Sequence, residues 1–117
     1  MNGPTRRLVR KLGKEYTVKN APREGGDRET PNYDEDGTVT AVLEQRQMPR
    51  VERDSHGEEI EVNLELRVAD ADAEQLHGAG SESHWPTRLE HPSGRVYEAV
   101  DVHQEDGGVW VITVRQT

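Results

Sequence analysis

The clearest pattern along the chain is a regular alternation of apolar and polar residues between positions 58 and 69. Successive side chains of a strand point to opposite faces of a sheet, so this alternation predicts a strand with one charged face. The apolar face would carry Ile60, Val62, Leu64, Leu66 and Val68. Residues 54–57 precede it with Asp first and Gly fourth, which is the preference of a type I turn.

Further segments have the alternation or the apolar content of strands. They are residues 15–19, 38–47, 87–91, 95–103 and 109–115. An Asp36-Gly37 turn signal precedes the second of them, and residues 91–94 have the Pro and Gly positions of another type I turn. The last segment is apolar on both faces, which is typical of a strand inside a sandwich or barrel or at a subunit contact. About six short strands predict an all-β fold, a small antiparallel barrel or sandwich.

The first third of the chain has less regular structure in its pattern. Residues 5–12 would form one short helix with Gly13 as its stop. Residues 20–37 have the Pro, Gly and Asp content of a loop. We therefore divide the chain into an N-terminal arm and loop, 1–37, and a β-barrel domain, 38–117. Residues 70–86 form a long polar connection, with a helical turn near residues 73–76.

Charge separates the same two parts. The chain has 15 Lys and Arg against 23 Asp and Glu, a net charge of −8. Residues 1–28 carry eight basic and three acidic residues, a net +5, whereas residues 29–117 carry seven and twenty, a net −13. A body rich in carboxylates and free of lysine suits concentrated salt, where the Debye length falls to about 3 Å near 1 M. We favour a halophilic source over an ordinary acidic mesophilic protein.

Motifs for catalysis are missing from the sequence. Without cysteine, a disulfide, a thiol nucleophile and a Cys-ligated zinc site are excluded. The five histidines lack the tight spacing of metal ligands. The segment beginning at Asp70 resembles a calcium loop, but Gln75 stands where Gly is needed and Ser81 where the bidentate Glu belongs. We expect no catalytic residue, no cofactor and no metal, and no apolar run is long enough to span a membrane.

The arm is the best candidate for a binding site. Its basic residues accompany three apolar ones that the predicted helix places on one side, Leu8, Val9 and Leu12. Binding to phosphates would weaken steeply in concentrated salt, and no aromatic platform for bases accompanies the arm. Docking on an acidic protein neighbour, with the apolar side buried there, explains the composition better. The predicted docking residues are Arg6, Arg7, Leu8, Val9, Arg10, Lys11 and Leu12.

Two consecutive segments resemble a known family of viral proteins. Residues 87–103 read Thr-Arg-Leu-Glu-His-Pro-Ser-Gly-Arg-Val-Tyr-Glu-Ala-Val-Asp-Val-His, and residues 109–115 read Val-Trp-Val-Ile-Thr-Val-Arg. This order of strand, Gly-bearing turn, aromatic-containing strand, hairpin and apolar strand resembles the small head-closure (stopper, head–tail connector) proteins of long-tailed viruses. The alternating strand before them lies where that family has its central strand. The resemblance covers residues 38–115.

The resemblance implies a structural virion protein of the viral neck, assembled in the host cytoplasm, here from a virus of a halophilic archaeon. Copies of the chain would form a ring, typically twelvefold, with the portal or adaptor protein above and a tail protein below. DNA would pass through without sequence-specific binding. The family's plug is a loop between early strands, by position residues 48–57. Alternatives are a tail terminator or other neck component, and an OB- or SH3-like nucleic-acid-binding barrel using Tyr97 and Trp110 as exposed aromatics.

Overall fold

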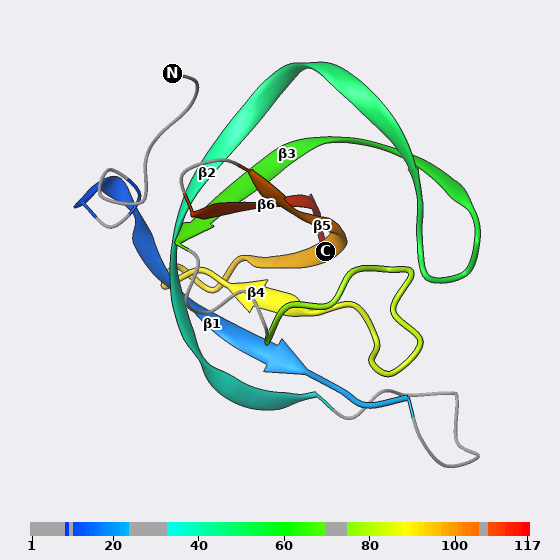
Figure 1. The fold of residues 1–117 in the computed structure, drawn as a ribbon, viewed down its shortest axis with the longest axis horizontal. Coiled ribbons are helices and arrows are strands. Elements are labelled where there is room, and N and C mark those ends of the chain that lie inside the picture. Colours follow the sequence, from blue (N-terminus) through cyan, green and yellow to red (C-terminus); the bar gives the residue numbers. More distant parts are fainter. Residues whose placement is uncertain (1–8, 10, 24–32, 70–74, 106–107) are drawn as a thin grey trace.

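Six antiparallel strands close into a barrel (Figure 1). The computed structural model describes residues 9, 11–23, 33–69, 75–105 and 108–117. Its strands are β1 (Lys14–Asn20), β2 (Asp34–Arg53), β3 (Glu59–Ala69), β4 (Arg88–Glu90), β5 (Val96–Glu105) and β6 (Val109–Gln116). Their order is β1-β2-β3-β6-β5-β4, and pairing of β1 with β4 closes the sheet. The all-β prediction is confirmed, and of its two forms the chain adopts the barrel.

The barrel begins earlier in the chain than we expected. β1 pairs with both β2 and β4, so the barrel starts at Lys14 rather than at residue 38. The Asp36-Gly37 pair does not form a turn before β2. It lies within that strand as a bulge opposite Val18, and Gly37 has a φ of 105°. A bulge and a turn both use the positive φ that glycine tolerates. The Asp-Gly pair therefore indicated a position of positive φ correctly, but the prediction that this position is a turn was wrong.

β2 continues well beyond the predicted end at residue 47. After Ala41 it pairs only with β3, and the register shifts between Gln45 and Arg50. Pro49 lies in this irregular stretch, where a missing N–H removes no ladder hydrogen bond. The position expected for a plug loop, residues 48–57, is therefore strand as far as Arg53. Only residues 54–57 form the predicted turn, with the Gly57 N–H donating to the Asp54 carbonyl over 3.0 Å.

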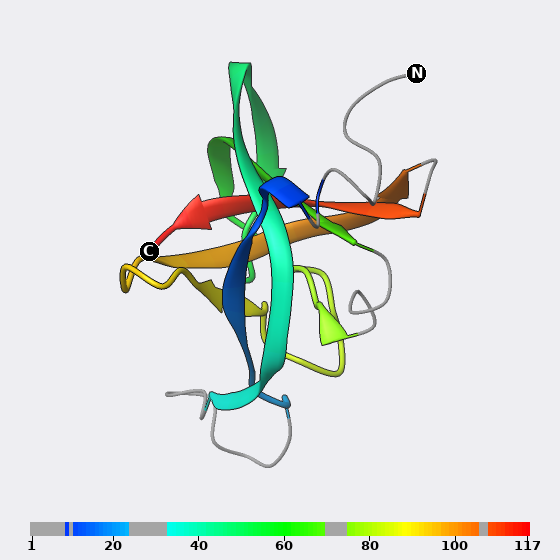
Figure 2. The same cartoon turned by 90° about the vertical axis from the view of Figure 1, so that its left-hand side faces the viewer.

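We call residues 46–63 the ribbon. This part of β2 and β3 arches away from the barrel in Figures 1 and 2 and returns to it at the turn, where an Asp54 carboxylate oxygen lies 3.7 Å from Arg115. The faces of the ribbon differ in exposure. The Asp54 side chain is almost fully buried, whereas Arg53 is exposed. One face therefore turns toward the barrel and the other toward solvent.

The barrel interior is filled mainly by aliphatic side chains and two tyrosines. Its buried cluster consists of Tyr16, Val18, Val39, Ala41, Leu66, Val68, Leu76, Leu89, Tyr97, Ala99, Ile112 and Val114. Residues 109–114 of β6 are buried on both faces, apart from the half-buried Trp110, as the doubly apolar pattern predicts. The predicted turn at residues 91–94 is also present, with the Gly94 N–H donating to the His91 carbonyl over 2.8 Å.

The described part of the connection between β3 and β4, residues 75–87, closes one end of the barrel. Leu76 packs into the core, and the backbone beside it is held by the fully buried Thr87. The Thr87 hydroxyl donates to the Asn20 side-chain oxygen over 2.6 Å and accepts from the His77 N–H over 2.7 Å. The Asn20 amide in turn donates to the Gln75 carbonyl. Within the described residues, no helix has the length and apolar content needed to cross a bilayer.

Candidate docking surfaces

One described residue of the predicted docking arm, Val9, packs on the chain's own barrel. Val9 is fully buried against Ala69 and Val109 of the same chain, so the prediction that it docks on a neighbour is wrong. The predicted helix stop is present, since the Gly13 N–H donates to the Val9 carbonyl over 2.8 Å. Leu12 is 62% exposed and does not share the environment of Val9. Lys11 is exposed, while Arg6, Arg7, Leu8 and Arg10 lie outside the described residues.

A pocket of about 490 Å³ lies at the barrel end opposite the closed one. It is bounded by the start of β1, the middle of β2 and the turn between β4 and β5. Its floor is made by Tyr16 and Tyr97, whose rings meet edge to face with centroids 6.2 Å apart. The His91 ring packs against Tyr16 at 5.3 Å. Leu12 and Leu43 stand exposed at the rim, so the pocket offers apolar surface to a partner.

The charged groups at this pocket are basic. Lys14 and Arg95 line it and are exposed, and neither forms an ion pair with a carboxylate in the described part of the chain. Burial, and then the nearby Tyr97, raise the pKa of Tyr16, so its hydroxyl stays neutral. The His91 Nδ1 accepts a hydrogen bond from the Ser93 N–H over 3.0 Å. An apolar pocket that has at its edge two cations without a carboxylate partner among the described residues suits a ligand that is apolar and anionic.

The solvent face of the ribbon is a second exposed surface. Val51 is 65% exposed and lies directly opposite Glu61 across the β2–β3 ladder. Opposite residues in antiparallel strands have their Cβ atoms about 4.5–5.5 Å apart, so an apolar side chain and a carboxylate stand side by side. Met48, at the register shift, is 75% exposed. The ribbon therefore carries exposed apolar side chains together with an acidic group, which the lining of the pocket lacks.

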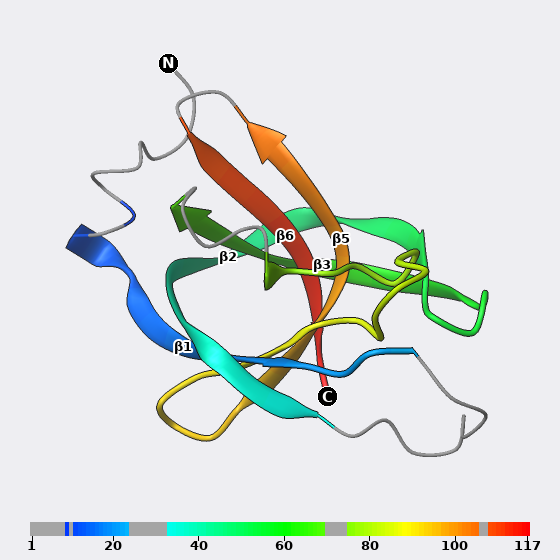
Figure 3. The ribbon, with the colours of Figure 1, turned by 60° about the horizontal axis from the view of Figure 1, so that its bottom comes forward.

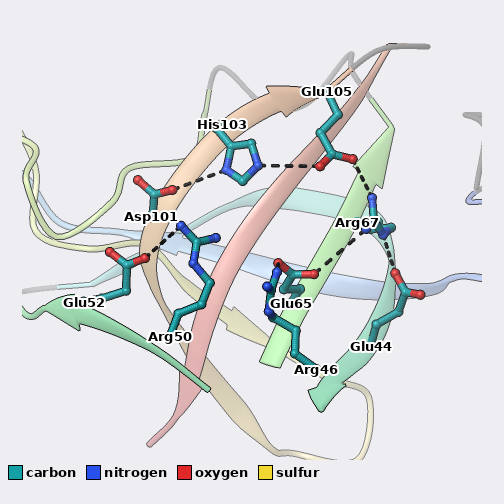
Figure 4. Close-up of polar contacts among 9 residues, drawn as sticks. All are labelled: Glu44, Arg46, Arg50, Glu52, Glu65, Arg67, Asp101, His103 and Glu105. Atoms are coloured by element: carbon teal, nitrogen blue, oxygen red, sulfur yellow. Dashed lines mark hydrogen bonds and ion pairs between the residues drawn. The ribbon is translucent and has the colours of Figure 1, made fainter. Parts of the chain in front are cut away.

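A chain of ion pairs crosses the outer face of the barrel (Figure 4). Arg67 on β3 contacts Glu44 on β2 and, over 2.7 Å, Glu105 on β5. His103 lies between the carboxylates of Glu105 and Asp101, at 3.7 and 3.3 Å. Nearby, Arg46 bonds the buried Glu65 over 2.9 Å, and Arg50 bonds Glu52 over 3.2 Å (Figure 4).

This chain of ion pairs covers an apolar strand. Val111 on β6 is paired with Arg67 on one side and His103 on the other, and it is fully buried. Burial alone would lower the pKa of Arg67, but its hydrogen bonds to Glu105 and Glu44 outweigh that and raise it. The hydrogen bond from Arg67 is also the main reason why the pKa of Glu105 is lowered. The arrangement fits a stabilising role, since all its charged groups have partners.

The remaining candidates from the sequence are placed as follows. His77 and His84 stack in parallel with centroids 3.9 Å apart, and burial followed by the charge of His84 lowers the pKa of His77. Within the described ranges, no group of three His, Asp or Glu side chains is close enough to hold a metal ion. The first five positions of the calcium-like segment, residues 70–74, lie outside the described residues. Tyr97 is 2% exposed and offers no stacking face, while Trp110 is half-buried and packs against the core.

Fold and surfaces together define a small closed β-barrel with a projecting ribbon and an apolar, basic pocket. The pocket escaped sequence analysis because its walls come from the arm, β2 and the β4–β5 turn, which are far apart in the chain. No protein-family model matches the chain, and no curated protein matches it either.

Proposed function

We propose that the chain is a structural virion protein of the neck of a tailed virus, a head-closure or head–tail connector subunit. Copies form a ring below the portal or adaptor protein, close the DNA channel and provide the surface to which the tail attaches. The observation that carries this proposal is the ribbon. It projects from a closed barrel with Met48 and Val51 exposed, and strand edges and apolar side chains left open in this way favour contacts with other proteins.

The charge of the chain supports the same function. Residues 29–117 carry a net −13, and six of the seven arginines there form ion pairs with carboxylates of the same chain. A ring of such barrels repels DNA phosphates, so DNA slides through its channel without being gripped. The resemblance of residues 38–115 to head-closure proteins, which implies a small barrel that forms a ring, supports the same proposal.

A barrel that binds nucleic acid is the less favoured function. Single-stranded nucleic acid is held by aromatic platforms combined with basic grooves. The two aromatics that we expected to serve are Tyr97, which is buried, and Trp110, which is packed on the core. Tyr33 and Trp85 are each covered by an arginine, with Arg88 at 4.3 Å and Arg23 at 4.2 Å from the ring centroids.

Electron microscopy of the native particle, in concentrated salt, tests the proposal. A ring of copies on the portal axis, between the portal and the tail, is the expected result. A ring that caps the head-proximal end of the tail tube itself would instead establish the tail-terminator alternative. A chain found as a monomer, or away from any viral neck, would contradict the proposed function.

A further inference from the structure

We propose that the pocket of one copy binds the ribbon of a second copy. Val51 enters the apolar part of the pocket, and Glu61 faces Lys14 and Arg95 at its edge. This contact joins neighbouring subunits in the ring, so its setting rests on the function proposed above. Its chemistry concerns two surfaces of this chain alone and is tested separately.

Exposed apolar side chains single out these two surfaces. In the described residues, the large apolar side chains left exposed are Leu12, Leu43, Met48 and Val51. The first two stand at the rim of the pocket, and the other two lie on the ribbon. Docking the ribbon in the pocket therefore brings the exposed Val51 against the exposed Leu12 and Leu43. Because burial of apolar surface is the main favourable term in association, this pairing uses what the barrel leaves exposed.

Charge complementarity fixes which part of the ribbon enters. Lys14 and Arg95 lack a carboxylate partner among the described residues, and Glu61 lacks a described cationic one. Elsewhere on the solvent face of the ribbon, Arg53 and Glu59 already pair with each other at 3.8 Å. Among the described residues of this face, Glu61 is thus a carboxylate without an ion-pair partner beside an exposed apolar residue. Apolar contacts supply the affinity, and the ion pairs select the register and exclude other partners.

The two surfaces also face different ways. Figures 1 and 3 show the start of β1 and the β4–β5 turn on one side of the molecule, and the turn between β2 and β3 on the opposite side. A copy can therefore offer its ribbon to one neighbour and its pocket to another. Such a heterologous, head-to-tail contact generates a ring when its rotation closes, whereas a two-fold contact would stop at a dimer.

Cysteine cross-linking tests the contact directly, because the natural chain contains no cysteine. The full chain carrying Leu12→Cys and Val51→Cys is oxidised in concentrated salt and run on a non-reducing gel. We expect a ladder of dimers, trimers and larger species, since each copy links to two neighbours. The matched control carries Val51→Cys with Ser83→Cys, an exposed position on the connection at the closed end of the barrel. A ladder of equal intensity in the control, or none in the test variant, overturns the proposal.

Charge reversal gives a second readout. The variant Lys14→Glu with Arg95→Glu should weaken self-association by about tenfold or more, because it sets like charges against each other. Glu61→Lys alone should weaken it similarly, and combining all three changes should restore most of it. All three positions are exposed, so circular dichroism should show an unchanged fold. Unaltered association in the reversed variants, no recovery in the combination, or a wild type that stays monomeric at every concentration overturns the contact.

Electron microscopy of the particle separates this inference from the proposed function. A ring on the portal axis whose neighbours meet through other surfaces keeps the function and refutes the contact. A ladder that forms in solution, from a chain that the particle holds away from its neck, keeps the contact and refutes the function.

Discussion

Replacing Arg67 by methionine should destabilise the barrel by about 2 kcal/mol at neutral pH. The change removes a guanidinium that contacts Glu44, Glu105 and, at 4.0 Å, the buried Glu65. Hydrogen bonds to charged groups contribute about 1.5–3 kcal/mol each when protected, and exposed ion pairs about 0.2–1 kcal/mol. Arg67 is 17% exposed, but its partners Glu44 and Glu105 are 44% and 40% exposed. The contribution of each of these two bonds to stability should therefore lie between the exposed and the protected values.

Replacing Arg67 by alanine separates the effect of its charge from the effect of its packing over Val111. Methionine keeps an apolar stem beside Val111, whereas alanine uncovers part of that fully buried side chain. Exposing roughly 40 Å² of apolar surface costs about 1 kcal/mol. We therefore expect Arg67→Ala to be less stable than Arg67→Met by about that amount. Equal stability of the two variants would mean that the arginine stem does not shield Val111.

The pH dependence has a defined sign. Arg67 lowers the pKa of Glu105 in the folded state, so its stabilisation is present above the unfolded pKa of about 4.3 and is lost as pH falls through the folded pKa. The difference in unfolding free energy between wild type and Arg67→Met should shrink below about pH 4. It should shrink also in about 1 M salt, which screens the carboxylates left behind.

Unfolding in urea is the suitable assay, because urea carries no charge and does not itself screen ion pairs. Both proteins are measured at the lowest salt at which the wild type is folded. A variant as stable as the wild type under that condition would refute the reasoning. A destabilisation of the same size at pH 7 and pH 3.5 would refute the electrostatic part of it and leave only packing.

Three further predictions follow from the packing and charge of the chain. Gly13→Ala should cost about 1–3 kcal/mol in urea unfolding, because an added Cβ would lie 2.5 Å from the Val9 carbonyl oxygen; no loss would refute the close approach. Thr87→Val leaves the Asn20 side-chain oxygen without its buried donor and should cost about 1–3 kcal/mol, whereas Thr87→Ser should retain most of the stability. The melting temperature of the wild type should rise with salt as its carboxylates are screened, and a salt-independent value would contradict the halophilic interpretation.

Local patterns in the sequence predicted most of the strands. The alternation around Leu66 has the period of a strand, and the turns at residues 54–57 and 91–94 depend on a few neighbouring residues. β6 was recognised because apolar residues on both faces require burial on both sides. In each case the structural cause lies within about ten residues, which is the range over which periodicity and turn preferences act.

Features decided by distant pairing were missed. Met48 and Pro49 look like the end of a strand, yet β2 continues because β3 still offers a partner beyond the register shift. The Asp36-Gly37 pair has the same local preference in a turn and in a bulge, and only the pairing with β1 decides between them. The role of Val9 was assigned to a neighbouring subunit, because the sequence does not show that Ala69 and Val109 leave a site for it.

The proposed contact between the pocket and the ribbon also depends on how distant strands pair. An exposed Val51 is unremarkable alone, since single apolar residues are common on protein surfaces. Its position in β2 makes it relevant to a contact. This strand pairs with β1 only as far as Ala41, where it forms one wall of the pocket, and it then continues into the ribbon. One long strand thus carries the pocket rim at Leu43 and the complementary face at Val51. Because β2 spans Asp34–Arg53, one strand can contribute to two surfaces that face different neighbours, as the proposed head-to-tail contact requires.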